Sequence, residues 1–257
     1  MNILSVSNLT KAFGGLKAVS DVNVEINKGE LVGLIGPNGA GKTTIFNLLT
    51  GVYDPTEGDV VFLGKNINKL KPYQVTQSGM ARTFQNIRLF SDLTVLDNVK
   101  IAYHSHANHG VLSSILRLPS FAKGEVEITK KAIEFLKIFK LDNKKDEVAK
   151  NLPYGEQRRL EIARALATEP KLLLLDEPAA GMNPHETKEL MEMIRWIRNN
   201  FNLTILLIEH DMSLVMGVCE RIYVLDYGQI IAHGNPDEIR NNPKVIEAYL
   251  GEEVANA

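Results

Sequence analysis

Alternation of apolar and polar residues marks the first strands of the chain. Val22, Val24 and Ile26 alternate with polar residues before an Asn-Lys-Gly-Glu turn, the period-2 pattern of a half-buried strand. The run DVVFLG repeats this pattern after the turn signal DPTEG. By contrast, ELVGLIG is a nearly continuous apolar run that ends in glycine, which is typical of a parallel strand buried on both faces.

The last third of the chain alternates between strands and helices. The apolar runs KLLLLD, TILLIEH and RIYVLDYG are separated by the helical patterns ETKELMEMIRWIRN and DMSLVMGV. In the first of these helices Leu190, Met193, Ile194 and Ile197 form one apolar stripe, and we interpret Trp196 as a packing residue. Strands that alternate with helices predict a parallel sheet covered on both faces.

The middle of the chain has helical periodicity. Ile128, Ala132, Phe135 and Phe139 recur near helical spacing with charged residues between them. A poorly periodic stretch rich in Gly, Ser and His precedes them. We therefore expect a mostly helical insert here.

Composition limits the class of protein. The chain has 257 residues, 44% of them hydrophobic and 23% charged, with a net charge of -2. This balance is ordinary for a globular protein and argues against a nucleic-acid binder that works by bulk charge. The single cysteine, Cys219, is expected to be a small buried apolar residue in a reducing compartment. We see no signal-peptide pattern and no apolar run long enough for a bilayer, so we expect a cytoplasmic protein.

A glycine-rich segment directly follows the continuous apolar strand. GPNGAGKTT, residues 36–44, matches the G-x-x-x-x-G-K-[ST] pattern of a phosphate-binding loop (P-loop) between a strand and a helix. The glycines let backbone N–H groups surround phosphate oxygens, and the following helix directs its positive end at the same anion. Lys42 supplies a cation to the β- and γ-phosphates, and Thr43 supplies a hydroxyl to Mg²⁺. A chance glycine-rich turn is the alternative, and the strand–loop–helix order argues against it.

Acidic residues and a histidine follow two other apolar strands. Asp176 and Glu177 end the run LLLLDE, and His210 follows TILLIE. Ligands of open α/β sheets bind at the carboxyl ends of strands, so these side chains are expected beside the P-loop. We expect Asp176 to bind Mg²⁺, Glu177 to act as general base and His210 to contact the γ-phosphate. Each of them alone would be interpreted as a strand cap or a structural histidine.

The order of five motifs resembles one family over essentially the whole chain. GPNGAGKTT, TFQN, PYGEQRRLEIARAL, LLLLDEPAAGMNP and IEH follow one another, and this order is similar to that of the ATP-binding subunits of ABC transporters. The resemblance implies an ATP hydrolase of the α/β class. It would have a RecA-like P-loop NTPase core on a parallel sheet, an antiparallel β subdomain and a helical signature subdomain. Residues 1–86 and 162–257 would form the core, and residues 87–161, with an insert near 103–125, the helical subdomain.

The resemblance also assigns residues to ATP and Mg²⁺. It places Phe13 against the adenine with Ala18 nearby, Gln85 in a loop that senses Mg²⁺ and the γ-phosphate, and the D-loop from Ala179. The catalytic set is Lys42, Gln85, Glu177 and His210, and the metal set is Thr43, Gln85 and Asp176. The nucleotide contacts are Phe13, Ala18, Gly36, Pro37, Asn38, Gly39, Ala40, Gly41, Lys42, Thr43, Thr44, Gln85, Asp176, Pro153, Tyr154, Gly155, Glu156 and Gln157.

The signature stretch LPYGEQ departs from the family's usual L-S-G-G-Q. Pro153 stands in place of the serine and Tyr154 in place of a glycine. Loss of the serine hydroxyl removes one hydrogen bond to a charged oxygen, a contribution of about 1.5–3 kcal/mol. Gly155 and the positive end of the helix are then expected to hold more of the phosphate.

The resemblance further implies partners and a location. Members form head-to-tail dimers in which each ATP lies between the P-loop of one subunit and the signature motif of the other. The expected partners are a second ABC ATPase subunit in a homo- or heterodimer, integral membrane permease subunits and, indirectly, a periplasmic or extracellular solute-binding protein. The stretches ARTFQNIRLFSDLTVLDNV and DEPAAGMNP look like the branched-chain amino acid uptake ATPases. We expect the protein on the inner face of the cell membrane.

Three other functions are weighed against this one. The ATPase of lipopolysaccharide export is the alternative within transport, but it usually keeps a serine-glycine-glycine signature. A non-transport ABC ATPase acting on DNA or ribosomes would be expected to carry a long coiled coil or two such domains. A pure binding module would lack the acidic pair and His210.

The run HSHANH, residues 104–109, could suggest a metal site, but it contains no Cys or carboxylate.

Overall fold

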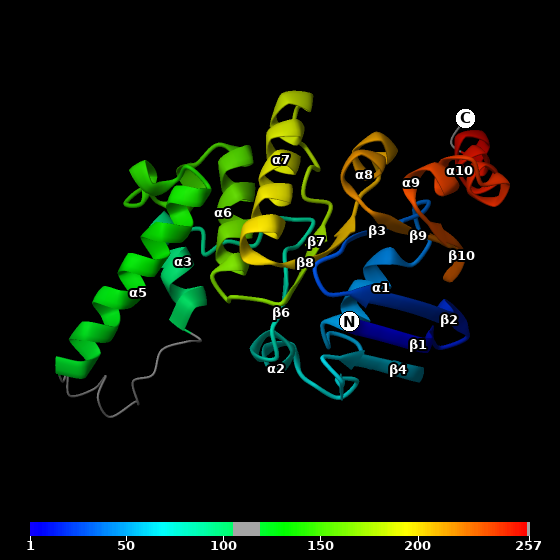
Figure 1. Cartoon of the computed structure of the whole chain (residues 1–257), viewed down its shortest axis with the longest axis horizontal. Helices are drawn as coiled ribbons and strands as arrows, with labels where there is room; N and C mark the ends of the chain where they lie inside the picture. The colour runs from blue at the N-terminus through cyan, green and yellow to red at the C-terminus, as the bar shows by residue number, and fades with distance from the viewer. Residues whose placement is uncertain (105–118, 256–257) are drawn as a thin grey trace. The chain divides into compact units, whose positions relative to one another are not determined.

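The computed structural model describes residues 1–104 and 119–255 (Figure 1). Contacts divide the chain into two compact units, which we call the core unit (Met1–Arg82 with Lys171–Ala257) and the helical unit (Thr83–Pro170). The helical unit contains the whole of helix α6 (Tyr154–Leu166). The subdomain boundary expected from the sequence, after residue 161, lies inside this helix.

The core unit is built on a six-stranded sheet. Its strand order is β10-β9-β3-β8-β7-β6, and only the β9–β10 pair is antiparallel. The strands are β3 (Leu31–Ile35), β6 (Met80–Arg82), β7 (Leu172–Asp176), β8 (Thr204–Ile208), β9 (Arg221–Asp226) and β10 (Gln229–Gly234). Strands β3, β7 and β8 are buried along their whole length, which confirms the prediction from their continuous apolar runs.

Helices cover both faces of this sheet (Figure 1). Helices α7 (Pro184–Phe201) and α8 (Met212–Val218) lie on one side of it and α1 (Lys42–Leu49) on the other. Gly33 in β3 permits close packing of α8, since a Cβ there would lie 2.9 Å from Val215 Cγ1. The remaining helices of the core unit are α2 (Pro72–Gln77), α9 (Pro236–Arg240) and α10 (Pro243–Ala255).

An antiparallel sheet packs on the α1 side. Its order is β2-β1-β4-β5, with β1 (Asn2–Phe13), β2 (Leu16–Asn27), β4 (Glu57–Phe62) and β5 (Lys65–Asn66). Val22, Val24 and Ile26 are buried, as their alternation predicts. They share one apolar cluster with Phe46 and Leu49 of α1, so this cluster fixes the helix that follows the P-loop.

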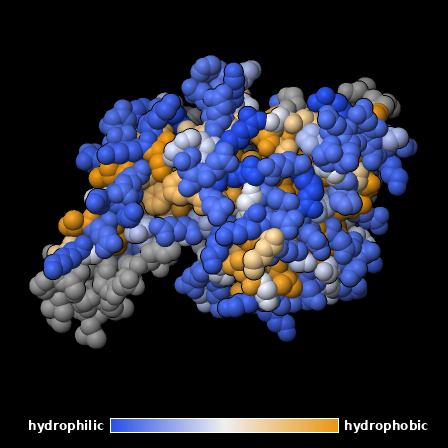
Figure 2. All heavy atoms as spheres, in the orientation of Figure 1, coloured by the Kyte–Doolittle hydropathy of each residue, from blue (hydrophilic) through white to orange (hydrophobic). Residues whose placement is uncertain are grey.

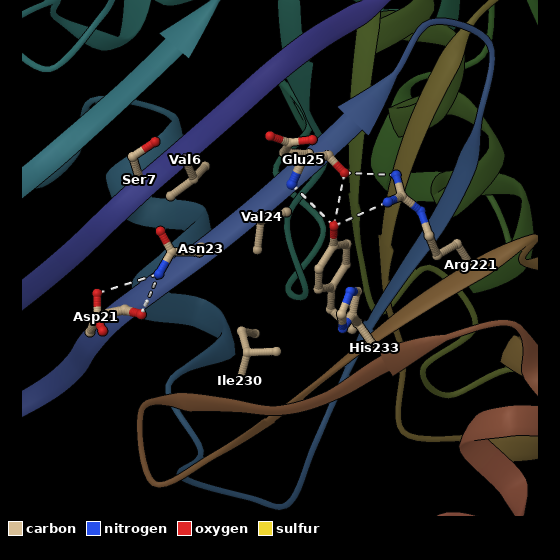
Figure 3. A pocket seen from close by; sticks show the side chains of 10 residues that line it. Val6, Ser7, Asp21, Asn23, Val24, Glu25, Arg221, Ile230 and His233 are labelled. Carbon is tan, nitrogen blue, oxygen red and sulfur yellow. Dashed lines mark hydrogen bonds between the residues drawn. The ribbon is translucent and has the colours of Figure 1, made fainter.

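Side chains of β9 cover the outer edge of β2 (Figure 3). The Tyr223 hydroxyl accepts from the backbone N–H of Glu25 at 3.1 Å and donates to its carbonyl at 3.0 Å. Arg221 donates to the same carbonyl at 2.8 Å. Beside them lies a groove of about 460 Å³ that includes Asp21 and His233 among its lining residues. None of the site residues predicted from the sequence lines it.

The helical unit contains α3 (Val95–Tyr103), α5 (Pro119–Ile138), two 3₁₀ turns (Asp142–Lys144 and Ala149–Asn151) and α6. Ile128, Ala132 and Phe135 are buried on α5, and Phe139 is buried just after its end. The predicted helical face is therefore confirmed. The His-rich prediction falls mostly outside the described residues: only His104 is described, and its Nε2 lies 3.2 Å from Glu125.

Helix α7 differs in part from its prediction. Leu190, Ile194 and Ile197 are buried, but Met191 rather than Met193 completes the buried face. Trp196 is 48% exposed, and its ring meets the Phe201 ring edge-to-face, with centroids 6.3 Å apart. Trp196 therefore packs on Phe201 at the surface rather than in the core, because it lies two positions from Ile194, on another face of the helix.

The surface view shows a mostly hydrophilic face with separate hydrophobic patches (Figure 2). Among residues 1–104 and 119–255, no helix combines the length and the apolar character that crossing a bilayer requires. Cys219 is buried, as expected, and burial raises the pKa of its thiol to about 12.

Candidate functional site

The P-loop connects β3 to α1, and its backbone requires glycine. Gly36, Gly39 and Gly41 have φ angles of 151°, 77° and 105°, values that side chains rarely permit. A Cβ on Gly36 would lie 1.9 Å from the carbonyl oxygen of Leu225, and one on Gly41 would lie 2.6 Å from that of Ala18. The tight turn predicted from the sequence is therefore enforced by close backbone contacts from distant segments.

Two parts of the P-loop differ in exposure. Asn38, Gly39 and Thr43 are exposed at the rim of the loop, whereas Lys42 is only 6% exposed. The Lys42 ammonium donates to the carbonyl oxygens of Gly36 and Pro37, at 2.5 and 2.8 Å. The lysine is thus held within the loop, at the amino end of α1, where an anion is favoured.

The hairpin between β9 and β10 supports the P-loop. The Gly228 N–H donates to the carbonyl oxygen of Ala40 at 2.9 Å, and the Ser20 N–H donates to that of Gly228 at 2.8 Å. A Cβ on Gly228 would lie 2.7 Å from the Ala18 carbonyl oxygen. Ala18, predicted near the nucleotide, therefore lies beside the P-loop and the hairpin.

Asp176 is bound by an arginine that sequence reasoning missed. Arg82 Nη2 lies 2.7 Å from Asp176 Oδ2, and both side chains are nearly buried, at 6% and 5% exposed. The other end of the Arg82 guanidinium donates to Asn47 on α1 at 2.7 Å. Arg82 ends the short strand β6 beside β7. The sequence signal was a basic residue just before TFQN, but a three-residue strand is too short for a periodicity.

Glu177 and His210 follow neighbouring strands, β7 and β8, and lie together. His210 Nε2 is 2.5 Å from Glu177 Oε1. Glu177 has a φ of 47° and donates its N–H to the Ile208 carbonyl, so its backbone is held in a sparsely populated conformation. The histidine side chain is 44% exposed and the carboxylate 12%, so the pair is open to solvent mainly on the histidine side.

Glu209 is a second acidic residue that the sequence did not single out. It is 4% exposed, and its Oε1 accepts from the Ala179 N–H at 2.8 Å. Burial raises the pKa of this carboxyl from 4.5 to about 7; the backbone hydrogen bonds of Ala179 and His210 oppose that rise, and the charges of Glu177 and Asp211 add to it. Glu209 thus fixes the start of the predicted D-loop beside the Glu177–His210 pair.

The raised pKa of Glu209 predicts a pH-dependent stability. The folded state keeps the proton up to about pH 7 and the unfolded state loses it near 4.5, so the free energy of unfolding should fall as pH rises through this window. Glu209→Gln removes the titration and should raise the stability at pH 8 by about 3 kcal/mol, with little change near pH 4.5. Thermal unfolding at three pH values measures this. Glu192→Gln, on the exposed face of α7, is the control. If the thermal midpoint of Glu209→Gln changed with pH in the same way as that of the wild type, the prediction would be contradicted.

Phe13, the predicted adenine contact, belongs to an aromatic pair. The Phe13 ring is 44% exposed and meets the Tyr53 ring edge-on, with centroids 5.2 Å apart. The Lys11 ammonium lies 5.2 Å from the Phe13 centroid and 5.9 Å from that of Tyr53. Sequence reasoning missed Tyr53 and Lys11, because neither belongs to a motif.

The remaining predicted residues belong to the helical unit. Pro153 is the N-cap of α6 with φ -53° and ψ 152°, so the helix begins at Tyr154. Glu156 is paired with Lys144 at 2.7 Å, and Gln157 donates to the Leu152 carbonyl at 2.8 Å. Gln85 lies in the loop that follows β6. Its backbone carbonyl accepts a hydrogen bond from α6.

Oxygen donors in the core unit suit a magnesium ion. A threonine hydroxyl (Thr43) and a carboxylate (Asp176) are the hard ligands that Mg²⁺ prefers, with the rest of its shell supplied by water and phosphate. Within the described residues, no group of three or more His, Cys, Asp or Glu side chains could hold a metal by themselves.

Comparisons with known proteins agree with this geometry. The family model described as ABC transporter matches residues 19–180, and one described as branched-chain amino acid ATP-binding cassette transporter matches residues 229–255. The high-affinity branched-chain amino acid transport ATP-binding protein LivG of Escherichia coli (strain K12) is 51% identical over 97% of this chain and 98% of its own. The lipopolysaccharide export system ATP-binding protein LptB of Haemophilus influenzae is 36% identical over 98% and 99%. A crystal structure of an ATP-binding cassette of an ABC transporter in its ADP conformation superposes with a TM-score of 0.84, at 34% identity over 98% and 99% of the chains.

Proposed function

Because this chain belongs to the ABC transporter family, whose nucleotide-binding subunits are ATPases, we propose that it drives the uptake of branched-chain amino acids. One observation carries the choice of substrate. The 51% identity to a branched-chain amino acid transport protein extends over nearly the full length of both chains. The C-terminal match at residues 229–255 supports the same subgroup. The lower identity, 36%, to the lipopolysaccharide export protein makes export the second candidate.

The P-loop is the proposed site for the phosphates of ATP. Its backbone N–H groups and the amino end of α1 would surround the β- and γ-phosphates. Lys42 would exchange the carbonyls of Gly36 and Pro37 for phosphate oxygens. Thr43, Asp176 and, by resemblance, Gln85 would hold Mg²⁺, which when bound offsets the phosphate charge. Phe13 and Ala18 would contact the adenosine, with Tyr53 fixing the Phe13 ring.

Hydrolysis in this proposal depends on the Glu177–His210 pair. The Glu177 carboxylate would accept a proton from the attacking water. His210, 2.5 Å away, would keep that carboxylate oriented, and its side chain, which is 44% exposed, would contact the γ-phosphate. Glu209 holds the backbone of Ala179 and so fixes the segment that follows the base.

Two subunits would complete each ATP site. By resemblance, residues 153–157 meet the nucleotide of a second ATPase subunit, head to tail, in a homo- or heterodimer. The dimer would act on integral membrane permease subunits at the inner face of the cell membrane, with a solute-binding protein as an indirect partner. ATP would favour the closed dimer only through contacts that the open form lacks.

The substrate proposal is tested with its partners. Membrane proteins that co-purify with the chain would be identified, and uptake of labelled leucine would be measured in cells with the wild type or Glu177→Gln. Importer-type permeases and uptake lost in the variant support the proposal. Exporter subunits, or uptake equal to wild type in the variant, would refute it.

Serine at the signature N-cap should strengthen the dimer. In a Glu177→Gln background, Pro153→Ser restores the hydroxyl that the family usually has at this position, and the dimer with ATP should tighten by about 1.5–3 kcal/mol. Sedimentation equilibrium with ATP measures the dissociation constant. Pro153→Ala is the matched control, because it removes the proline ring without adding a hydroxyl. A serine variant no tighter than the alanine variant would show that the hydroxyl makes no such contact.

A further inference from the structure

A fully buried ion pair lies on the inner side of α6. The Arg158 side chain is 0% exposed and that of Glu161 is 1%, and Arg158 Nη1 lies 2.9 Å from Glu161 Oε2. Buried pairs of this kind add little to stability on balance, because the charges lose their hydration. The two side chains are therefore expected to serve a purpose other than stability.

The pair forms hydrogen bonds to the backbone of the loop that contains Gln85. Arg158 Nη1 donates to the carbonyl oxygen of Phe84, and Nη2 donates to that of Gln85, both at 2.6 Å. Glu161 accepts from the backbone N–H of Arg88 at 3.1 Å and is also hydrogen-bonded by the Phe84 backbone. The backbone on both sides of Gln85 is thus fixed to one turn of α6.

The same guanidinium also contacts the first residue of α6. Arg158 Nη2 lies 3.2 Å from the Tyr154 hydroxyl, and its Cζ is 5.9 Å from the ring centroid. Tyr154 is the residue that stands where the family usually has glycine. A glycine could make neither contact, so this departure from the motif joins its first helical residue to the Gln85 loop.

Arginine suits this position better than lysine. Its planar fork supplies donors in several fixed directions, whereas an ammonium is a single compact group. Here one guanidinium serves two backbone carbonyls, a carboxylate and a phenol. A displacement of any of these groups must be shared by the others or must break a buried hydrogen bond, which is costly.

We propose that Arg158, held by Glu161, is a positioning residue that couples the chain's own nucleotide to the signature residues that it presents to its partner. The inference rests on the proposed function, in which Gln85 serves the γ-phosphate of this chain and residues 153–157 serve that of the second subunit. A shift of the Gln85 loop on ATP binding is transmitted through the guanidinium to Tyr154. The signature residues that complete the ATP site of the second subunit therefore respond to ATP bound by this chain.

Amide hydrogen exchange tests the coupling within single chains. The background is Glu177→Gln, at a concentration where sedimentation with ATP shows only monomers, and the peptide of interest covers residues 150–160. ATP, but not ADP, should slow its exchange by about 5- to 150-fold, the usual range for coupling between sites. Replacing both charges, Arg158→Met with Glu161→Met, should abolish this response while ATP affinity stays within about twofold of the background.

Two further variants separate coupling from folding. Tyr154→Phe removes only the hydroxyl and should reduce the response without lowering the thermal midpoint as the double variant could. Lys131→Met with Glu134→Met removes an exposed pair of the same i,i+3 spacing on α5 and should leave the response unchanged. An ATP response equal to that of the background in both the double variant and Tyr154→Phe would overturn the inference. So would ATP binding with no response in the background, whereas absence of ATP binding would remove the proposed function itself.

Discussion

Glu177→Gln should abolish steady-state ATP hydrolysis while ATP binding persists. The amide cannot accept a proton from water at neutral pH, and loss of a general base typically lowers the rate by about 10²–10⁴-fold. Glutamine has nearly the same shape and can keep a hydrogen bond to His210, which lies 2.5 Å from the wild-type carboxylate. Phosphate release and nucleotide binding by calorimetry measure the two effects separately.

A matched glutamate gives the control for this variant. Glu189→Gln changes an exposed carboxylate on α7 and should leave phosphate release within experimental error of wild type. Phosphate release by Glu177→Gln at the wild-type rate would remove Glu177 from its assigned role. Glutamate and glutamine are both expected to keep the strained φ of 47° at position 177. A fall in the rate of Glu177→Gln would therefore report the chemistry of the carboxylate.

Gly36→Ala should destroy the P-loop. The new methyl group would lie 1.9 Å from the Leu225 carbonyl oxygen, and φ at this position is 151°. A clash with backbone cannot be relieved by a side-chain rotation, so we expect a loss of about 3 kcal/mol or more in the free energy of unfolding. Displaced backbone N–H groups should weaken ADP binding by about a hundredfold or more, since each 1.4 kcal/mol is a factor of ten.

Substitutions at two other glycines separate the effect of backbone strain from that of steric clash. Gly39 has a φ of 77° but open space where its Cβ would lie, and Gly15 has open space without a positive φ. Gly39→Ala should therefore cost about 1 kcal/mol through backbone strain alone, and Gly15→Ala should be close to neutral. Thermal unfolding and ADP calorimetry on the three variants give the order. Equal midpoints for Gly36→Ala and Gly15→Ala would contradict the steric argument.

Local patterns were enough to predict the strands and the residues at their ends. The apolar runs before Gly36, Asp176 and His210 are contiguous in sequence; Gly36 and Asp176 directly follow their runs, and His210 follows one residue later. Parallel pairing of β3, β8 and β7 then places these ends at one edge of the sheet. The proximity of Glu177 to His210 was predictable for this reason.

Residues defined only by distant partners were not predictable. Arg82 is recognisable only from Asp176, and Arg158 only from the carbonyls of Phe84 and Gln85. Glu209 looked like part of a strand ending, and its raised pKa depends on burial that the sequence does not show. Their partners lie from 30 to 94 positions away along the chain, beyond the reach of periodicity or capping patterns.

The contact between the β9–β10 hairpin and the P-loop affects how the protein is made. Gly228 hydrogen-bonds Ala40, and β3 lies between β8 and β9, which come late in the chain. A ribosome that has synthesised the P-loop has therefore not yet supplied the segments that fix its backbone, and contacts so distant in sequence form slowly. We expect the nascent chain to acquire its affinity for nucleotide only after residue 228 has left the exit tunnel, so that no half-finished subunit can bind ATP.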